Sequence, residues 1–209
     1  MLFRLGRMPS ETERVCGDLE REYGAGASML SGTASFMGHD DYENSYIADI
    51  LNSVRTIAIV GASSNDVRPS FFVAKYLVAK GFQVYPINPG HAGSEIAGQL
   101  TYARLADVPV PIDMVDIFRA SEAVPGVVDE ALALNPLPKV IWMQLGVRND
   151  QAAAKAESAG IKVVMNRCPK IEYARLAGEI GWNGVNSGVL SSRKPVMGTG
   201  YQSLGVRKT

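Results

Sequence analysis

Short apolar runs alternate with amphipathic segments through the middle of the chain. The runs are rich in β-branched residues and occupy positions 56–60, 83–87, 114–118, 139–145 and 161–165. Segments with helical spacing of apolar residues lie between them, at 70–80, 121–134 and 149–159. Nearly continuous apolar strands joined by helices are typical of a parallel sheet, because each parallel crossover needs a long connection and covers a face. The pattern predicts an α/β, Rossmann-like doubly wound parallel sheet of about five strands.

Both ends of the chain depart from this rhythm. Residues 1–37 mix charges with a Gly/Ala/Ser-rich stretch and are expected to form a flexible leader. Residues 172–209 are Gly/Ser-rich and are expected to form a C-terminal extension, packed on the domain or on a second copy of it. The compact domain is therefore expected over residues 38–171. It should open with a short helix capped by Asp40 or Asp41, with apolar positions at Tyr46, Ile47, Ile50, Leu51 and Val54.

Charge and cysteine content narrow the class of protein. The chain has 21 basic and 21 acidic residues, so no overall field draws it to nucleic acid or to an anionic membrane. Cys16 and Cys168 lack the C-x-x-C spacing of a redox or metal motif, and a reducing cytoplasm is expected. No apolar run approaches the roughly 20 residues that span a bilayer, and the polar N-terminus does not resemble a secretory signal.

The stretch "VGASSNDVRPS" follows the first apolar run and leads into the first of the amphipathic segments. Ligands of doubly wound sheets bind at the carboxyl ends of the strands, so this loop is a candidate phosphate site. Its glycine and small residues permit close backbone approach, the next helix offers its positive end, and Arg68 adds charge. The alternative is a plain strand-to-helix turn capped by Ser70. The candidate ligand-contacting residues are Gly61, Ala62, Ser63, Ser64, Arg68 and Ser70.

Two missing features limit the kind of nucleotide. A nicotinamide dinucleotide site usually carries an acidic residue at the end of the second strand, to hold the ribose. Here that strand ends in "YPINPGHAG", and the first carboxylate is Glu95. The loop also lacks the G-K-[ST] of a Walker motif, so it has no lysine or magnesium ligand for ATP or GTP hydrolysis.

Five motifs in order resemble the CoA-binding domain family, the Rossmann-like module that also begins the succinyl-CoA synthetase alpha subunit and related acyl-CoA synthetases. They are "IVGASSNDVRPS", "YPINPG", "DMVDIFRASEAVP", "VIWMQLGV" and "VVMNRCPKIE". The resemblance covers about residues 45–172 and is strongest to small stand-alone bacterial members. It implies that the first loop lies along the phosphates of coenzyme A.

The resemblance also implies contacts at the ends of the other strands. Asn88, Pro89 and Gly90 would approach the 3′-phosphorylated ribose, and His91 stands where the synthetases have a lysine, a stronger partner for an anion. Phe118 and Arg119 would lie at the adenine end, although Phe118 fits equally well in a core and Arg119 could pair with Glu122. The pantetheine path would follow Met143, Gln144, Leu145 and Gly146, of which Met143 is also a natural core residue.

The remaining reactive groups do not form a recognisable catalytic set. His39 is expected to be solvated at the leader boundary. Cys168 could be a reactive thiol at a helix N-terminus, although a structural cysteine is the favoured interpretation. Asp113 and Asp116 are three residues apart on a strand, so they face opposite sides and do not share an acid–base site. No catalytic residue and no metal ligand is assigned.

The sequence therefore predicts a cytoplasmic, non-catalytic protein that binds coenzyme A or an acyl-CoA. A homo-oligomer through residues 172–209 is the expected partner besides this small molecule, with no nucleic acid and no membrane. Two alternatives stay open. One is an oxidoreductase that binds NAD(P) in the same cleft and reads a 2′-phosphate with Arg68 or Arg119. The other is an interaction module that has no ligand and works through its C-terminal extension.

Overall fold

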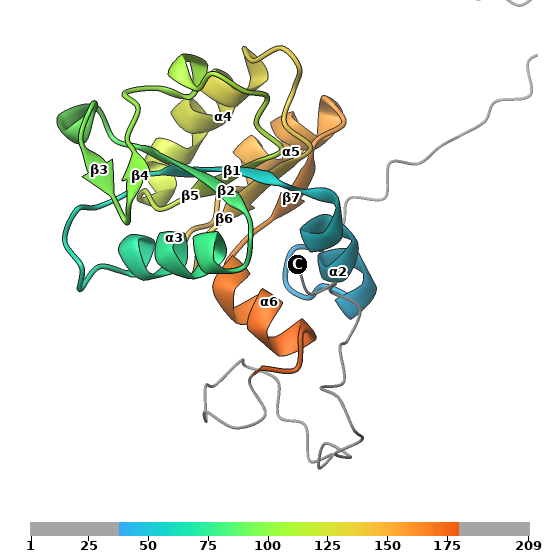
Figure 1. Cartoon of the computed structure of the whole chain (residues 1–209). Helices are drawn as coiled ribbons and strands as arrows, with labels where there is room; N and C mark the ends of the chain where they lie inside the picture. The colour runs from blue at the N-terminus through green and yellow to red at the C-terminus, as the bar shows by residue number, and fades with distance from the viewer. Residues whose placement is uncertain (1–37, 180–209) are drawn as a thin grey trace, which may run out of the picture. The chain divides into compact units, whose positions relative to one another are not determined.

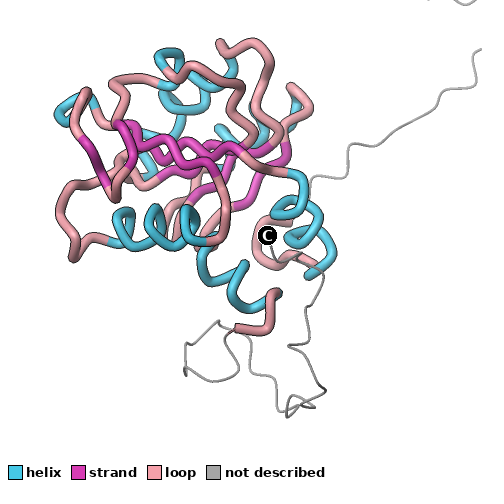
Figure 2. The backbone as a smooth tube through the Cα atoms, viewed as in Figure 1, coloured by secondary structure: helices cyan, strands magenta, loops and turns pink. Residues whose placement is uncertain are grey.

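A parallel sheet of five strands forms the centre of the protein, whose computed structural model describes residues 38–179. The strands run in the order β2-β1-β5-β6-β7 (Figures 1 and 2). Their bounds are β1 Thr56–Val60, β2 Gln83–Ile87, β5 Met114–Ile117, β6 Val140–Met143 and β7 Lys162–Val164. Every pairing in this sheet is parallel. The predicted doubly wound α/β sheet is confirmed, and each strand lies within its expected run.

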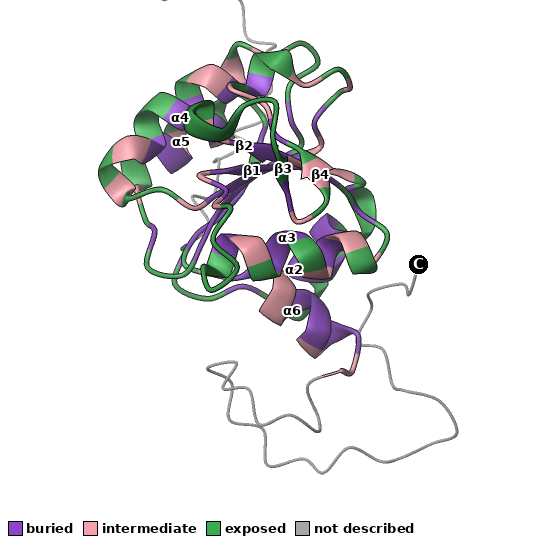
Figure 3. Cartoon of the chain, turned by 60° about the vertical axis from the view of Figure 1, so that its left-hand side comes forward, coloured by how far each residue is buried: buried purple, intermediate pink, exposed green. Residues whose placement is uncertain are grey.

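Helices cover both faces of the sheet (Figure 1). One face carries α2 (Asn44–Ser53), α3 (Pro69–Ala79) and α6 (Pro169–Leu176), and the other carries α4 (Val124–Leu132) and α5 (Asp150–Ser158). Strand β1 divides its side chains between them, because successive strand residues point to opposite faces. Ile57 and Ile59 join the core beneath α2, α3 and α6, whereas Ala58 and Val60 join the core beneath α4 and α5. Figure 3 shows the resulting contrast between buried inner and exposed outer helix surfaces.

Short elements that the periodicity did not predict follow β2. A 3₁₀ helix, η1 (Pro89–His91), leads to a hairpin of β3 (Glu95–Ile96) and β4 (Gln99–Leu100). The chain then returns beside the end of β2, where the Tyr102 amide donates to the Pro86 carbonyl at 2.9 Å. Two further 3₁₀ helices, η2 (Leu105–Asp107) and η3 (Ser121–Ala123), precede β5 and α4. Strands of two residues are too short to show an alternating pattern.

The start of the described chain corrects two expectations. Helix α2 begins after Glu43, so neither Asp40 nor Asp41 is its N-cap. Asp41 instead accepts from the Tyr42 amide at 2.9 Å, and Asp40 pairs with Arg148. His39 is buried rather than solvated. Its Nδ1 lies 2.8 Å from the Tyr42 hydroxyl and its Nε2 lies 3.3 Å from Glu157 Oε1, a contact between residues far apart in the sequence.

The compact part extends beyond its expected end at residue 171. Helix α6 runs to Leu176, and Tyr173, Leu176 and Ala177 belong to the core beneath α2 and α3. The glycine-rich composition that set the expected boundary begins only after this helix. The predicted leader, residues 1–37, and the part of the predicted extension from residue 180 onward lie outside the described residues. Within residues 38–179, no helix is both long and apolar enough to cross a membrane.

Candidate ligand-binding site

The loop after β1, residues 61–68, begins with a glycine that no other residue could replace without strain. Gly61 has a positive φ of 86°, and its amide donates to the Ile87 carbonyl at 3.0 Å. A Cβ atom at this position would lie 2.8 Å from the carbonyl oxygen of Phe118, which follows β5. The loop therefore starts pressed between the ends of β2 and β5, beside the β1/β5 boundary at which doubly wound sheets of this order bind ligands.

One peptide group of this loop is held from two sides. The Ala62 carbonyl accepts from Asn88 Nδ2 at 2.7 Å, and the Ser63 amide donates to Ser70 Oγ at 3.1 Å. The amides on either side of this peptide, those of Ala62 and Ser64, have no hydrogen-bond partner among the residues that the structure describes. The Ser64 amide lies on an exposed residue near the N-terminus of α3, whose first turn has no acidic residue, whereas Ala62 is only 1% exposed.

Two arginines, Arg68 at the end of the loop and Arg119 beside Gly61, supply positive charge here. Arg68 and Arg119 are exposed, and neither forms an ion pair within residues 38–179. The alternative pairing of Arg119 with Glu122 is therefore absent from this part of the chain. On the other side of the loop, His91 Nε2 lies 3.5 Å from Ser64 Oγ. Asp66 is the one carboxylate in the loop itself. An anion is the ligand that this combination of charges favours.

The residues that directly follow β2 could present backbone groups and the imidazole of His91 to a ligand, and they include no carboxylate. Asn88 Oδ1 accepts from the Gly90 amide at 2.9 Å and caps η1, so both polar atoms of this side chain have protein partners. Pro89, Gly90 and His91 are exposed beside the loop. The sequence argument that no acid holds a ribose here is consistent with the structure, where Glu95 lies further along in β3.

The predicted residues after β5 and β6 lie differently from one another. Phe118 is half-buried against the core, whereas Arg119 is exposed. Met143 is fully buried, which supports the alternative that it is a core residue. Gln144 is also buried and turns inward, while Leu145 and Gly146 are exposed. Of the candidate residues, Ala62 and Ser70 are buried as well. Those with exposed or half-buried positions are Gly61, Ser63, Ser64, Arg68, the residues of η1, Arg119, Leu145 and Gly146.

Comparison with known proteins decides the family. A family model described as the CoA binding domain matches residues 55–174, from just before β1 into α6. The chain belongs to the CoA binding domain family. The resemblance predicted from the five motifs is thereby confirmed.

Three similar proteins are each matched over most of their own length. The uncharacterized protein YneT of Bacillus subtilis (strain 168) is 34% identical over 128 residues, which are 61% of this chain and 92% of YneT. The structure of cell-free ID.343 from Thermus thermophilus matches with a TM-score of 0.61 and 34% identity, over 64% of this chain and 98% of that one. A hypothetical protein from Pyrococcus horikoshii OT3 gives a TM-score of 0.62 and 36% identity, over 66% and 95%.

A buried polar contact between Asp116 and Gln144 was not predicted from the sequence. Asp116 on β5 is fully buried, and Gln144 Nε2 donates to its two carboxyl oxygens at 3.1 and 3.2 Å. Burial raises the pKa of Asp116 well above its usual value, and the hydrogen bond from Gln144 opposes that rise only in part. Asp113 faces the other way: burial opposes its ionisation, but Lys139 and two backbone amides outweigh this and lower its pKa.

Cys168 follows β7 at the same edge of the sheet and is buried. It is the N-cap of α6, and burial raises the pKa of its thiol despite backbone hydrogen bonds that act in the opposite direction. A buried, protonated thiol is a poor nucleophile, as the structural interpretation of this cysteine requires. No group of three acidic, histidine or cysteine side chains in the described chain could hold a metal ion.

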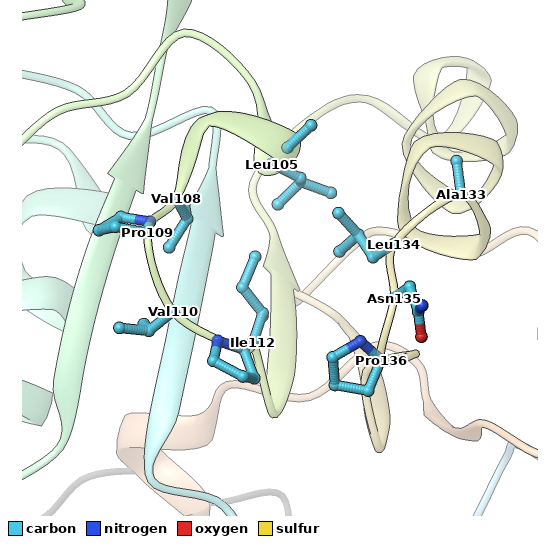
Figure 4. A pocket seen from close by; sticks show the side chains of 11 residues that line it. Leu105, Val108, Pro109, Val110, Ile112, Ala133, Leu134, Asn135 and Pro136 are labelled. Carbon is cyan, nitrogen blue, oxygen red and sulfur yellow. The ribbon is translucent and has the colours of Figure 1, made fainter.

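A cavity of about 380 Å³ lies away from this site, among residues of the segments 105–112 and 133–136. These segments precede β5 and β6, so the cavity adjoins the amino ends of the strands (Figure 4). Its lining is aliphatic and proline-rich, with Asn135 supplying a side-chain amide. It has none of the charge that a phosphate would need, and it does not coincide with any residue predicted from the sequence.

Proposed function

We propose that this protein binds coenzyme A or an acyl-CoA without catalysing a reaction itself, with the pyrophosphate on the loop of residues 61–68. The observation that carries the proposal is the pair of amides at Ala62 and Ser64 without a partner in the described chain, in a loop that ends at Arg68, the N-cap of α3, and begins at Gly61, against which Arg119 lies. Backbone donors at a helix N-terminus suit a phosphate, and the arginines add charge-assisted contacts. Membership of the CoA binding domain family supports coenzyme A as the source of that phosphate.

The rest of the ligand would extend from this loop in two directions. The 3′-phosphorylated ribose would lie over η1, near His91, and the adenine near Phe118 and Arg119. The pantetheine arm would pass Leu145 and Gly146, both of which are exposed. Met143 and Gln144 would support this path from below, because both are buried.

A binding role rather than a catalytic one is supported by the state of the candidate reactive groups. Asp116 and Cys168 are buried, and burial raises the pKa of both, so neither offers a charged nucleophile or base at the surface. His91 and Ser64 approach each other at 3.5 Å, but no carboxylate within residues 38–179 bonds to the imidazole. A serine–histidine pair without an orienting acid lacks the arrangement of a hydrolase.

Calorimetric titration of the full chain with CoA, acetyl-CoA and NADPH tests the proposal. We expect saturable binding of CoA, of acetyl-CoA, or of both, and weaker binding of NADPH, because the chain belongs to the CoA binding domain family and its loop lacks the G-x-G-x-x-G spacing of a dinucleotide site. Tight NADPH binding without a response to either CoA compound would instead support the oxidoreductase alternative and would contradict the proposal.

A further inference from the structure

The two contacts on the Ala62–Ser63 peptide hold it from opposite ends. Asn88 Nδ2 donates to the Ala62 carbonyl at 2.7 Å, and Ser70 Oγ accepts from the Ser63 amide at 3.1 Å. Asn88 follows β2 and Ser70 lies in the first turn of α3, so the two contacts come from separate elements. A peptide group is planar, so fixing its oxygen and its N–H fixes its orientation.

Both side chains that hold this peptide are themselves fixed. Asn88 Oδ1 accepts from the Gly90 amide at 2.9 Å, and the Asn88 amide donates to the Tyr102 carbonyl at 2.9 Å. The Ala62 carbonyl and the Gly90 amide also determine which side-chain atom of Asn88 is the nitrogen, because a carbonyl can only accept and a backbone amide can only donate. Ser70 is only 4% exposed and lies within a helix. We call the contacts of Asn88 and Ser70 with the Ala62–Ser63 peptide the clamp, and both of its side chains are held in place by the protein.

We propose that Asn88 and Ser70 are positioning residues, which set ligand affinity by holding the Ala62–Ser63 peptide rather than by contacting the ligand. This inference rests on the proposed function. The clamped peptide lies between the partnerless amides of Ala62 and Ser64. A carbonyl that turned toward a bound phosphate would repel it, whereas here the Ala62 carbonyl is engaged by Asn88. Donors that are already oriented cost less to organise when the anion binds.

The side chain at position 88 must both donate to the Ala62 carbonyl and accept from the Gly90 amide, which a side-chain amide can do. A carboxylate of nearly the same shape would still accept from the Gly90 amide, but it could not donate to the Ala62 carbonyl. Position 88 is also where a dinucleotide site would have its acidic residue. Where a dinucleotide site has an acidic side chain that binds the ribose, this protein has Asn88, whose side chain binds the loop after β1. Asn88→Asp should lose one arm of the clamp without gaining a useful ribose partner.

The experiment compares three ligands that share a pyrophosphate: CoA, 3′-dephospho-CoA and ADP. Asn88→Ala, Asn88→Asp and Ser70→Ala are each expected to weaken binding of all three by a similar factor, about tenfold. The double variant Asn88→Ala/Ser70→Ala should lose little more than either single variant, because both act on one peptide. A loss with CoA that disappears with 3′-dephospho-CoA and ADP would show that Asn88 contacts the 3′-phosphate directly, and would overturn the proposal. Unchanged affinity in the folded variants would overturn it as well.

Asn149 provides a matched control. Its Nδ2 donates to the Ser121 carbonyl at 3.2 Å and its Oδ1 accepts from the Ala152 amide at 2.9 Å, the same pattern as Asn88 but at the start of α5. Asn149→Ala should lower the free energy of unfolding through the lost cap, yet leave the affinity for all three ligands within about twofold. A tenfold loss in this control would mean that affinity follows general stability, against the proposal.

Amide hydrogen exchange in the absence of ligand tests the clamp separately from ligand binding. The Ser63 amide should exchange more slowly than the amide of the exposed Ser64, and Ser70→Ala should remove this protection. Asn149→Ala should not change it. A Ser63 amide that exchanges as fast as that of Ser64 would overturn the clamp. A native protein that binds none of the three ligands would instead reject the proposed function, and exchange would still decide whether the clamp exists.

Discussion

The loop after β1 and the loop after β6 lie at the same edge of one sheet, but they differ in their backbone donors and in the charges beside them. Both contain a glycine of positive φ, 86° at Gly61 and 76° at Gly146. The amides of Ala62 and Ser64 in the first loop have no partner within residues 38–179. In the second loop the Gly146 amide donates to Asn166 Oδ1 at 2.8 Å and Gln144 turns inward to Asp116, and among residues 144–148 the Leu145 amide is the one without a partner in the described chain.

Under the proposed function, the charges beside the two loops decide which of them would take the phosphates. In the first loop, the amides of Ala62 and Ser64 have no hydrogen-bond partner, and Arg68 and Arg119 form no ion pair, within residues 38–179. Arg148, near the second loop, forms ion pairs with Asp40 and Asp150. Most amides of the second loop are bonded within the protein, and its exposed side chain, Leu145, is apolar. The second loop therefore suits the neutral arm of a ligand better than its phosphates.

The largest expected effect comes from adding one methyl group to each loop. Gly61→Ala would combine a left-handed backbone with a Cβ that lies 2.8 Å from the Phe118 carbonyl oxygen. We expect it to lower the free energy of unfolding by about 3 kcal/mol or more. Gly146→Ala has the same kind of backbone but no atom within 4 Å of the new Cβ, so about 1–2 kcal/mol is expected. Urea unfolding of both variants measures this, and equal losses would show that the β1 loop is not pressed against β5.

A second test concerns the contact between Asp116 and Gln144 that closes the β5/β6 end. Burial raises the folded-state pKa of Asp116 above the unfolded value of about 3.9, so the folded protein retains a proton that the unfolded chain has released. The contribution of Asp116 to stability is therefore fully present below about pH 4, and it decreases as the pH rises toward the folded pKa. The slope can reach about 1.4 kcal/mol per pH unit.

Asp116→Asn removes this titration and keeps the shape of the side chain. The difference in unfolding free energy between the native protein and the variant, measured from pH 4 upward, should move steadily in favour of the variant as the pH rises. A difference that is constant with pH, or that moves in favour of the native protein, would show that Asp116 does not remain protonated in the fold.

The smallest expected effect separates the arginines of the two regions. Arg68→Ala should raise the dissociation constant for CoA about tenfold, because it removes an unpaired charge beside the open amides. Arg148→Ala is the matched control, since its charge is already engaged by Asp40 and Asp150. Titration calorimetry of both variants measures the contrast. Equal losses of affinity would mean that only the overall charge of this edge matters.

The parallel sheet was predictable because its strands are buried on both faces and appear as continuous apolar runs. Strands β1 and β2 fill their predicted runs, 56–60 and 83–87, completely. The hairpin of β3 and β4 was not predictable, because each strand has two residues and Ala97 adopts a positive φ of 53° that its residue type does not suggest. The burial of His39 was also missed, since it comes from contacts with Glu157 and with a tyrosine, Tyr42, that itself bonds to the Met165 amide.

One physical reason explains which features of the candidate site the sequence could indicate and which it could not. The composition of residues 61–70 and the missing acid after β2 identify the loop as a candidate anion site, because both are local properties of the sequence. Which amides are open is not local. The hydrogen bonds of this loop come from other elements: the Ser63 amide donates to Ser70 Oγ in α3, and Asn88 after β2 donates to the Ala62 carbonyl. The burial of Met143 and Gln144 likewise depends on the neighbouring strands rather than on residues beside them in the sequence.

The most direct test of this account is to follow backbone amide signals by NMR while CoA is added. We predict that the Ala62 and Ser64 amides, which have no protein partner in the described chain, shift most on binding, and that the Gly146 amide, which is bonded to Asn166, shifts much less. Large shifts confined to residues 143–147, with Ala62 and Ser64 unmoved by saturating CoA, would contradict it.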